Sequence, residues 1–159
     1  EFSSFAKMPR PNETKLDLLP LIENVIEVFK EEEKCTITLD LSIKECIVLA
    51  DKDMILRVFN NLIKNAIQSI INSKDGKIVI TISEVNENYL FEIKDNGIGI
   101  TEDKHSKIFV PYFTTKSTGT GLGLAMVKQI IETHRGKIWF DSIDNKGTTF
   151  YFQIPKINN

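Results

Sequence analysis

Residues 91–100 read Phe-Glu-Ile-Lys-Asp-Asn-Gly-Ile-Gly-Ile, and the fold of the chain depends on this stretch. Alternating apolar and polar residues over 89–94 predict a half-buried β-strand. The strand ends at Asp95, and Gly97 and Gly99 follow, where missing side chains would let a planar ring approach the backbone. Asp-Asn-Gly between apolar residues is also a β-hairpin signal. The hairpin is disfavoured because a long polar stretch, and no second strand, follows the second glycine.

The composition of the 159 residues describes one globular domain with its own core. A hydrophobic content of 42%, a charged content of 26% and a net charge of −2 argue against a dedicated nucleic-acid or membrane-surface binder. Cys35 and Cys46 lack metal-ligand spacing and are interpreted as reduced, partly buried thiols. No apolar run approaches the ~20 residues of a membrane span, and no signal peptide opens the chain. The domain is therefore expected to be cytoplasmic.

The periodicity of the sequence predicts three helices and six strands around a long irregular segment. Residues 96–120 lack sustained periodicity apart from a possible short helix near 102–109, which is typical of a disordered segment or a functional lid. The order of the elements predicts an α+β fold, a two-layer sandwich in which three helices cover one face of a mixed, mostly antiparallel sheet. Helices are expected at 17–33, 53–71 (capped by Asp51 or Asp53) and 121–134, and strands at 36–41, 46–50, 77–84, 89–95, 137–142 and 148–154.

The second predicted helix carries a row of side-chain amides. Asn61, Asn65 and Gln68 stand at positions i, i+4 and i+7 and so share one stripe. Each asparagine inside a helix costs about 0.5 kcal/mol of propensity relative to alanine, which suggests that a group outside the helix uses the amide oxygens. Such oxygens, facing phosphates, are suitable ligands for Mg²⁺. The alternative is a solvated polar face.

A second glycine cluster, Gly119, Gly121 and Gly123, opens the third predicted helix. Bare backbone N–H groups and the positive end of a helix attract anions, and Lys116 would add charge. No strand leads directly into the cluster and no Gly-Lys-Ser/Thr ends it, so it is neither a Rossmann fingerprint nor a P-loop. The cluster therefore indicates a phosphate site, with a flexible hinge as the alternative.

Five motifs in a fixed order resemble the N, first glycine, F, second glycine and third glycine boxes of the sensor histidine kinase ATP-binding domain. The resemblance covers about residues 16–154 and implies the Bergerat-type ATP-binding fold. Residues 2–11 and 57–61 resemble, more narrowly, nitrogen-regulation-type sensor kinases. The motifs are Asn61–Ala66, Asp95–Ile100, Phe109–Lys116, Gly119–Leu124 and Gly147–Phe150.

The resemblance implies a role for each of these residues. Asp95 would accept a hydrogen bond from the adenine amino group, beside Thr148, and Asn65, assisted by Asn61, would bind Mg²⁺. Phe109, Tyr112 and Phe113 would pack in the lid, and Asn65 and Lys116 would be the catalytic residues. The nucleotide contacts implied by the family are Asn61, Lys64, Asn65, Gln68, Asp95, Gly97, Gly99, Ile100, Lys116, Thr120, Gly121, Leu122, Gly123, Leu124 and Thr148.

The first amide of the row separates kinase from ATPase among proteins of this fold. The ATPases carry a glutamate general base one turn before the metal-binding asparagine, and this chain has Asn61 there, which takes no proton at neutral pH. A histidine acceptor supplies its own nucleophilic nitrogen. The resemblance therefore implies a protein histidine kinase that uses ATP and Mg²⁺. The alternatives are an ATPase of the same fold that drives conformational change, and a nucleotide-sensing module without transfer.

Residues 1–11 are expected to be the end of a preceding dimerisation and phosphoacceptor helix with its linker, and residues 12–159 the ATP-binding domain. Because the chain begins at Glu1, and because His105 and His134 do not match the family's acceptor motif, we expect a fragment that does not phosphorylate itself. The expected partners are the protein's own phosphoacceptor domain and a response regulator. The full-length protein is expected to be a homodimer, which could be anchored in the inner membrane. The isolated fragment is expected to be a monomer.

Overall fold

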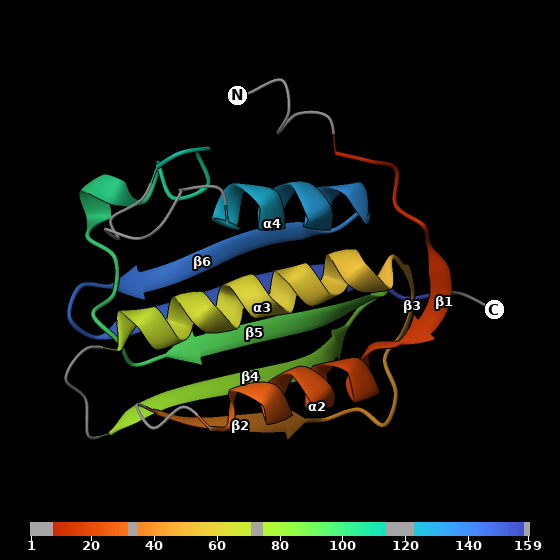
Figure 1. Ribbon diagram of the computed structural model, residues 1–159, viewed down its shortest axis with the longest axis horizontal. Helices are drawn as coiled ribbons and strands as arrows, with labels where there is room; N and C mark the ends of the chain where they lie inside the picture. Colours follow the sequence, from red (N-terminus) through yellow and green to blue (C-terminus); the bar gives the residue numbers. More distant parts are fainter. Residues whose placement is uncertain (1–7, 32–34, 71–74, 114–122, 158–159) are drawn as a thin grey trace.

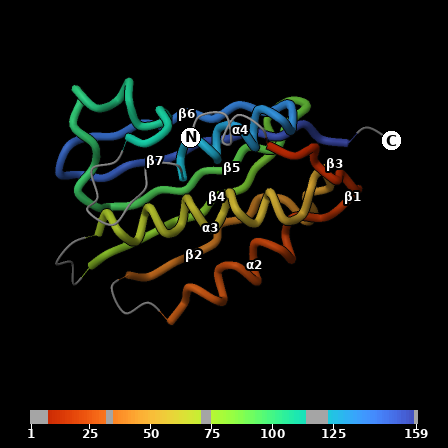
Figure 2. The backbone as a smooth tube through the Cα atoms, turned by 45° about the horizontal axis from the view of Figure 1, so that its top comes forward, coloured from red at the N-terminus to blue at the C-terminus, as the bar shows by residue number. Residues whose placement is uncertain are grey.

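The computed structural model describes residues 8–31, 35–70, 75–113 and 123–157, which form two layers (Figure 1). A five-stranded sheet is one layer, and three helices on one of its faces are the other (Figure 2). This is the expected α+β sandwich. In chain order the elements are β1 (Thr14–Asp17), α2 (Leu18–Phe29), β2 (Cys35–Leu41), β3 (Ile47–Ala50), α3 (Lys52–Ser69), β4 (Gly76–Val85), β5 (Asn88–Asp95), the 3-10 turn η1 (Glu102–Lys104), α4 (Gly123–Thr133), β6 (Lys137–Ile143) and β7 (Gly147–Pro155).

The main sheet has the strand order β2-β4-β5-β7-β6. Only the β2–β4 pair is parallel, and the other three pairs are antiparallel. The six predicted strands are confirmed with shifts of one residue at most at either end. One strand was not predicted: β1 pairs with β3 in a separate two-stranded sheet, with Thr14 opposite Ala50. The segment expected at 46–50 therefore serves this small sheet and not the main one.

Aspartates begin the first two helices. The Asp17 side chain accepts a hydrogen bond from the backbone N–H of Leu19 at 3.0 Å, and Asp51 accepts from Met54 at 3.1 Å. Asp51, and not Asp53, is thus the N-cap of α3. Helix α2 ends at Phe29, earlier than the predicted Glu33. Residues 32–34, 71–74 and 158–159, and the predicted helix end at 1–7, lie outside the described residues.

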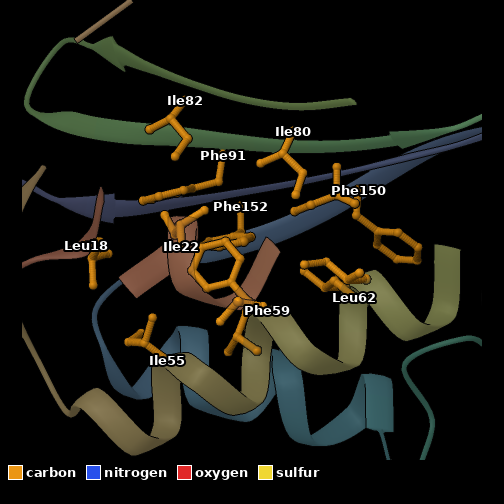
Figure 3. Close-up of a cluster of buried hydrophobic side chains, with 14 of the residues drawn as sticks. Leu18, Ile22, Ile55, Phe59, Leu62, Ile80, Ile82, Phe91, Phe150 and Phe152 are labelled. Atoms are coloured by element: carbon orange, nitrogen blue, oxygen red, sulfur yellow. The ribbon is translucent and has the colours of Figure 1, made fainter. Parts of the chain in front are cut away.

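Three phenylalanine rings form the centre of the core between the layers (Figure 3). Phe59 of α3 meets the rings of Phe91 and Phe152 edge to face, with centroids 5.8 and 5.5 Å away. Phe91 and Phe152 stack on neighbouring strands at 4.5 Å. All three side chains are fully buried. Edge-to-face pairs add to the free energy of burial, so this cluster holds α3, which carries the amide row, on β5, which ends at Asp95.

His134 joins the end of α4 to the start of α3. It is fully buried; its Nδ1 lies 2.8 Å from the Ile130 carbonyl oxygen, and its Nε2 accepts a hydrogen bond from the Asp51 backbone N–H at 3.0 Å. Since Nε2 accepts, Nδ1 carries the proton and donates, and the ring is neutral. His134 therefore has a structural role, which agrees with its mismatch to the family's acceptor motif.

Neither Cys35 nor Cys46 forms a disulfide in the described residues, and no helix of these residues could cross a membrane. Burial is the largest of the causes that raise the pKa of the Cys46 thiol. Cys46 is therefore an unreactive core side chain.

An ion pair fastens the segment before β1 to the end of α4. The Arg135 guanidinium reaches both carboxylate oxygens of Glu13, at 2.7 and 3.2 Å, and donates to the Leu49 carbonyl oxygen at 3.2 Å. The Asn12 backbone N–H donates to the Asp51 carboxylate at 2.7 Å. These contacts hold the chain's first described segment against β3 and the N-cap of α3.

We expect Glu13→Gln to lower the free energy of unfolding by about 0.5–1 kcal/mol at pH 7, a value kept small because Arg135 is half exposed. The hydrogen bond from Arg135 is the main cause that lowers the pKa of Glu13. A carboxylate with a lowered native pKa stabilises the fold above its unfolded pKa, and loses this contribution as the pH falls through the native pKa. The difference between wild type and variant in urea unfolding should therefore narrow from pH 7 to about pH 3. Glu23→Gln, on the exposed face of α2, is the matched control; a pH-independent difference would contradict the ion-pair explanation.

Candidate functional site

The candidate site lies at one end of the two layers. The end of β5, the C-terminal end of α3, the first turn of α4 and the β6–β7 turn all lie at the left in Figure 1, together with residues 100–113. All five sequence motifs contribute described residues to this end. The structure thus brings together residues that are up to about half the chain apart in sequence.

Asp95 is the last residue of β5 and is only 4% exposed. Its Oδ1 accepts hydrogen bonds from the backbone N–H groups of Gly97 at 2.9 Å and Thr148 at 3.3 Å. Its neighbours across the sheet are Ile78 of β4 and Thr148 of β7. The alternative of a hairpin turn at Asp95 to Gly97 is therefore wrong. Strand β5 pairs with β4, which precedes it, and with β7, and not with a strand that directly follows Gly97. Backbone donors fix a buried carboxylate in one orientation.

The two glycines after Asp95 are required by contacts within the protein. A side chain on Gly97 would collide with Ser69 at the end of α3, whose carbonyl oxygen accepts from the Ile98 N–H at 2.9 Å. Gly99 has a φ of +72°, and a Cβ there would collide with the Ile143 carbonyl oxygen. The sequence prediction assigned these glycines to ligand approach. The structure adds that they let the loop close against α3 and the β6–β7 turn.

Two polar side chains of this end had no predicted role. Asn96 accepts from the Lys77 N–H and donates to the Asp75 carbonyl oxygen, both at 2.8 Å, which ties the loop to the start of β4. The Ser142 hydroxyl lies 2.7 Å from both the Ile100 backbone nitrogen and the Thr148 hydroxyl. Ser142 is 42 residues from Ile100 in sequence, and only the pairing of β6 with β7 brings them together. No local pattern in the sequence signals this contact.

The amide row lies on α3 as predicted. Asn61 and Asn65 are half-buried, whereas Lys64 and Gln68 are exposed. The Asn61 Nδ2 donates to the Arg57 carbonyl oxygen at 2.8 Å. This contact turns the Oδ1 toward Gly123, the first residue of α4, where a Cβ would lie 2.7 Å from that oxygen. The amide oxygen of α3 and the positive end of α4 thus meet because position 123 is glycine.

The second glycine box is described only from its third glycine on. Gly123 and Leu124 are half-buried in the first turn of α4. The other predicted phosphate contacts, Lys116, Thr120, Gly121 and Leu122, lie outside the described residues.

Residues 100–113 pack against the sheet at their middle. The His105 Nε2 lies 3.0 Å from the Ile100 carbonyl oxygen, and its ring contacts Phe140 edge to face. The Phe109 ring contacts Phe140 and Phe150 with centroids at 6.0 and 6.3 Å. The predicted helix near 102–109 is reduced to η1 followed by turns. Of the three aromatic residues of the F box, Phe109 and Phe113 are packed against the core, and Tyr112 is 43% exposed.

The arrangement has two chemically different ends. At the first, the buried Asp95 carboxylate and the Thr148 hydroxyl can accept hydrogen bonds from a polar ring. At the second, the Asn61 oxygen lies beside the N-terminus of α4, where hard cations and anionic groups are stabilised together. The donor set fits a nucleotide whose phosphates carry Mg²⁺.

Comparison with known proteins agrees with this chemistry. The model of the histidine kinase-, DNA gyrase B- and HSP90-like ATPase family matches residues 50–158. Sensor histidine kinase ZraS of Escherichia coli O157:H7 is 38% identical over 143 residues, which are 88% of this chain and 31% of that protein. Sporulation kinase E of Bacillus subtilis is 39% identical over 113 residues, 70% of this chain and 15% of that protein. The chain thus spans about a third or less of the length of these relatives.

Solved structures of one histidine kinase match over nearly the whole domain. The catalytic domain of ThkA superposes with a TM-score of 0.81 at 36% identity and covers 91% of this chain and 96% of that one. ThkA in complex with the response regulator TrrA matches with a TM-score of 0.76 at 32% identity, over 91% of this chain and 42% of that one. These relatives do not single out the nitrogen-regulation subgroup, which stays a prediction. The chain belongs to the histidine kinase-, DNA gyrase B- and HSP90-like ATPase family, and it is the ATP-binding catalytic domain of a two-component sensor histidine kinase.

Proposed function

We propose that this domain transfers the γ-phosphoryl group of Mg·ATP to a histidine on a separate dimerisation and phosphoacceptor domain of the same protein. The observation that carries the proposal is Asn61, whose amide oxygen points at the first residue of α4. An amide can supply a ligand there but cannot remove a proton from water or serine. A reaction in which the acceptor nitrogen is already a nucleophile suits such a site.

At the adenine end, Asp95 accepts a hydrogen bond from the adenine amino group. Its orientation by two backbone N–H groups supports this role, since a carboxylate has about four acceptor sites and can serve backbone and ligand together. Thr148 lies beside it, and the backbone of Gly97, Gly99 and Ile100 forms the adjoining wall. This end selects the base and takes no part in bond making.

At the phosphate end, Asn65 and Asn61 would hold Mg²⁺ with their amide oxygens. Their half-buried positions one helical turn apart support a shared ligand. When bound, the ion neutralises charge on the phosphate oxygens. The backbone amides at Gly121 to Leu124 and the ammonium group of Lys116 hold the same phosphates, with Lys64, Gln68 and Thr120 at the periphery.

The reaction needs positioning more than acid–base chemistry. The acceptor imidazole nitrogen forms a bond to the γ-phosphorus while the bond from that phosphorus to the bridging oxygen of ADP breaks. Lys116 stabilises the charge that moves onto ADP, and Asn65 would hold the ion that supplies further positive charge there. The domain therefore contributes alignment and electrostatic stabilisation.

The partners of the whole protein follow from the same proposal. ThkA has been solved with a response regulator, and we infer a response regulator as the partner that receives the phosphoryl group here. The full-length protein would be a homodimer through the phosphoacceptor domain, with this domain in the cytoplasm, and the isolated fragment would be a monomer.

Labelled ATP tests the proposal, incubated with the fragment alone and with the separately produced phosphoacceptor domain of its parent protein. We expect acid-labile label on the phosphoacceptor domain only when both are present. Rapid phosphate release by the fragment alone would favour the ATPase. Nucleotide binding without transfer would favour a nucleotide-sensing module.

We expect Asn65→Ala to weaken binding of a non-hydrolysable ATP analogue about tenfold in the presence of Mg²⁺, since one ligand oxygen is lost. Binding of ADP without metal should change little. Titration calorimetry with and without Mg²⁺ measures both. Asn24→Ala, an exposed asparagine on α2, is the control. Equal losses with and without the ion would contradict the metal role of Asn65.

A further inference from the structure

The Ser142 hydroxyl joins three parts of the adenine end of the site. It lies 2.7 Å from the Ile100 backbone nitrogen, 3.1 Å from the Gly147 carbonyl oxygen and 2.7 Å from the Thr148 hydroxyl oxygen. Ile100 belongs to the loop after β5, and Gly147 and Thr148 begin β7. One serine thus connects the two segments that flank Asp95.

The partners of this hydroxyl determine where the protons lie. The Ile100 nitrogen can only donate, and the Gly147 carbonyl can only accept, so Ser142 accepts from the first and gives its single proton to the second. The third contact must then be donated by Thr148. Because a threonine hydroxyl also has one proton, Thr148 can act only as an acceptor toward any further partner.

We propose that Ser142 is a positioning residue that holds the Thr148 hydroxyl as an acceptor and so contributes to selection of 6-aminopurine over 6-oxopurine nucleotides. The inference rests on the proposed adenine site. Asp95, when ionised, also only accepts, so the two side chains that face the base from β5 and β7 both present acceptors. An amino group at purine C6 donates to such a pair, whereas a carbonyl oxygen there is repelled by it.

The test compares binding of ADP and inosine diphosphate, which carry an amino and an oxo group at C6, to the domain without metal. Wild type should bind ADP at least about tenfold more tightly. In Ser142→Ala the Thr148 hydroxyl loses its acceptor, so that it can rotate and donate its proton toward the ligand. ADP affinity should then fall roughly three- to tenfold while inosine diphosphate affinity stays constant or rises, so the selectivity ratio falls by the same factor or more.

Three variants separate positioning from a loss of structure. Ser142→Thr keeps the hydroxyl and should keep the ratio. Thr148→Val removes the group through which Ser142 acts, so Ser142→Ala should no longer change the ratio in that background. Ser83→Ala, a serine of β4, is the matched control. Should Ser142→Ala fail to fold, Ser142→Cys, whose thiol is a weak hydrogen-bonding group, provides the same measurement.

The outcomes distinguish this inference from the proposed function. If Ser142→Ala lowers both affinities by one factor, or if its effect persists in the Thr148→Val background, the positioning role is wrong while the adenine site stands. If Asp95→Asn leaves the wild-type ratio unchanged, the adenine site itself is misplaced. A ratio that falls in Ser142→Ala and is kept in Ser142→Thr supports the inference.

Discussion

Replacing Phe59 by alanine is expected to lower the free energy of unfolding by about 3–5 kcal/mol. The ring is fully buried and touches Phe91 and Phe152 edge to face at 5.8 and 5.5 Å. Its removal leaves a cavity where α3 meets the middle of the sheet, because the pairing of β5 with β7 holds the stacked rings of Phe91 and Phe152 in place. Urea unfolding followed by circular dichroism measures the loss.

Two controls show whether the loss comes from the cavity. Phe59→Leu keeps most of the apolar volume and should cost less than half as much as alanine. Val28→Ala removes apolar atoms from a side chain of α2 that is 75% exposed, and should change stability by less than about 0.5 kcal/mol. A loss below about 1 kcal/mol for Phe59→Ala would mean that this cluster does not anchor α3.

The elements that the sequence predicts well are those whose pattern repeats over several residues. Strand β5 alternates buried and partly exposed residues along its length, and α3 has an apolar stripe of eight buried residues. Helix α3 also begins at an aspartate that caps it. Periodicity and local capping are properties of neighbours in sequence, so they are visible without a structure.

Contacts between distant segments are what the sequence does not reveal. Strand β1 has four residues and no full alternation, and it becomes a strand only by pairing with β3. The neutral state of His134 depends on the Asp51 N–H, which is 83 residues away. Ser142 belongs to the site through the register of β6 on β7. Each role is set by a tertiary contact that no local pattern encodes.

The candidate site divides in the same way. The motifs predict that Asp95 and Thr148 lie close together, and the two are paired on neighbouring strands, while their roles toward a nucleotide stay a prediction. The sequence explains only in part why Gly97 and Gly99 are glycines. The segments that they contact, the end of α3 and the β6–β7 turn, are known only from the assembled fold.

We expect Asp95→Ala to weaken binding of ADP and ATP by roughly 30- to 150-fold, or about 2–3 kcal/mol, because a charge-assisted hydrogen bond to the adenine amino group is lost. Titration calorimetry measures the affinity. The variant also leaves the Gly97 and Thr148 N–H groups without their acceptor, which costs stability of its own, about 1–3 kcal/mol for each buried donor. The alanine variant alone therefore does not separate the loss of adenine recognition from the loss of local structure around the loop.

Asp95→Asn separates the two contributions. The asparagine oxygen can still accept from both backbone N–H groups, so the loop and its stability should be largely retained, as thermal unfolding would show. The amide NH₂ that replaces the second oxygen is a donor, and it would face the donating amino group of adenine. Nucleotide affinity should therefore fall about as far as in alanine, although the fold is kept, and inosine diphosphate should lose less than ADP. If Asp95→Asn bound ADP as wild type does, the carboxylate would be a structural group of the loop, and the adenine would have to lie elsewhere.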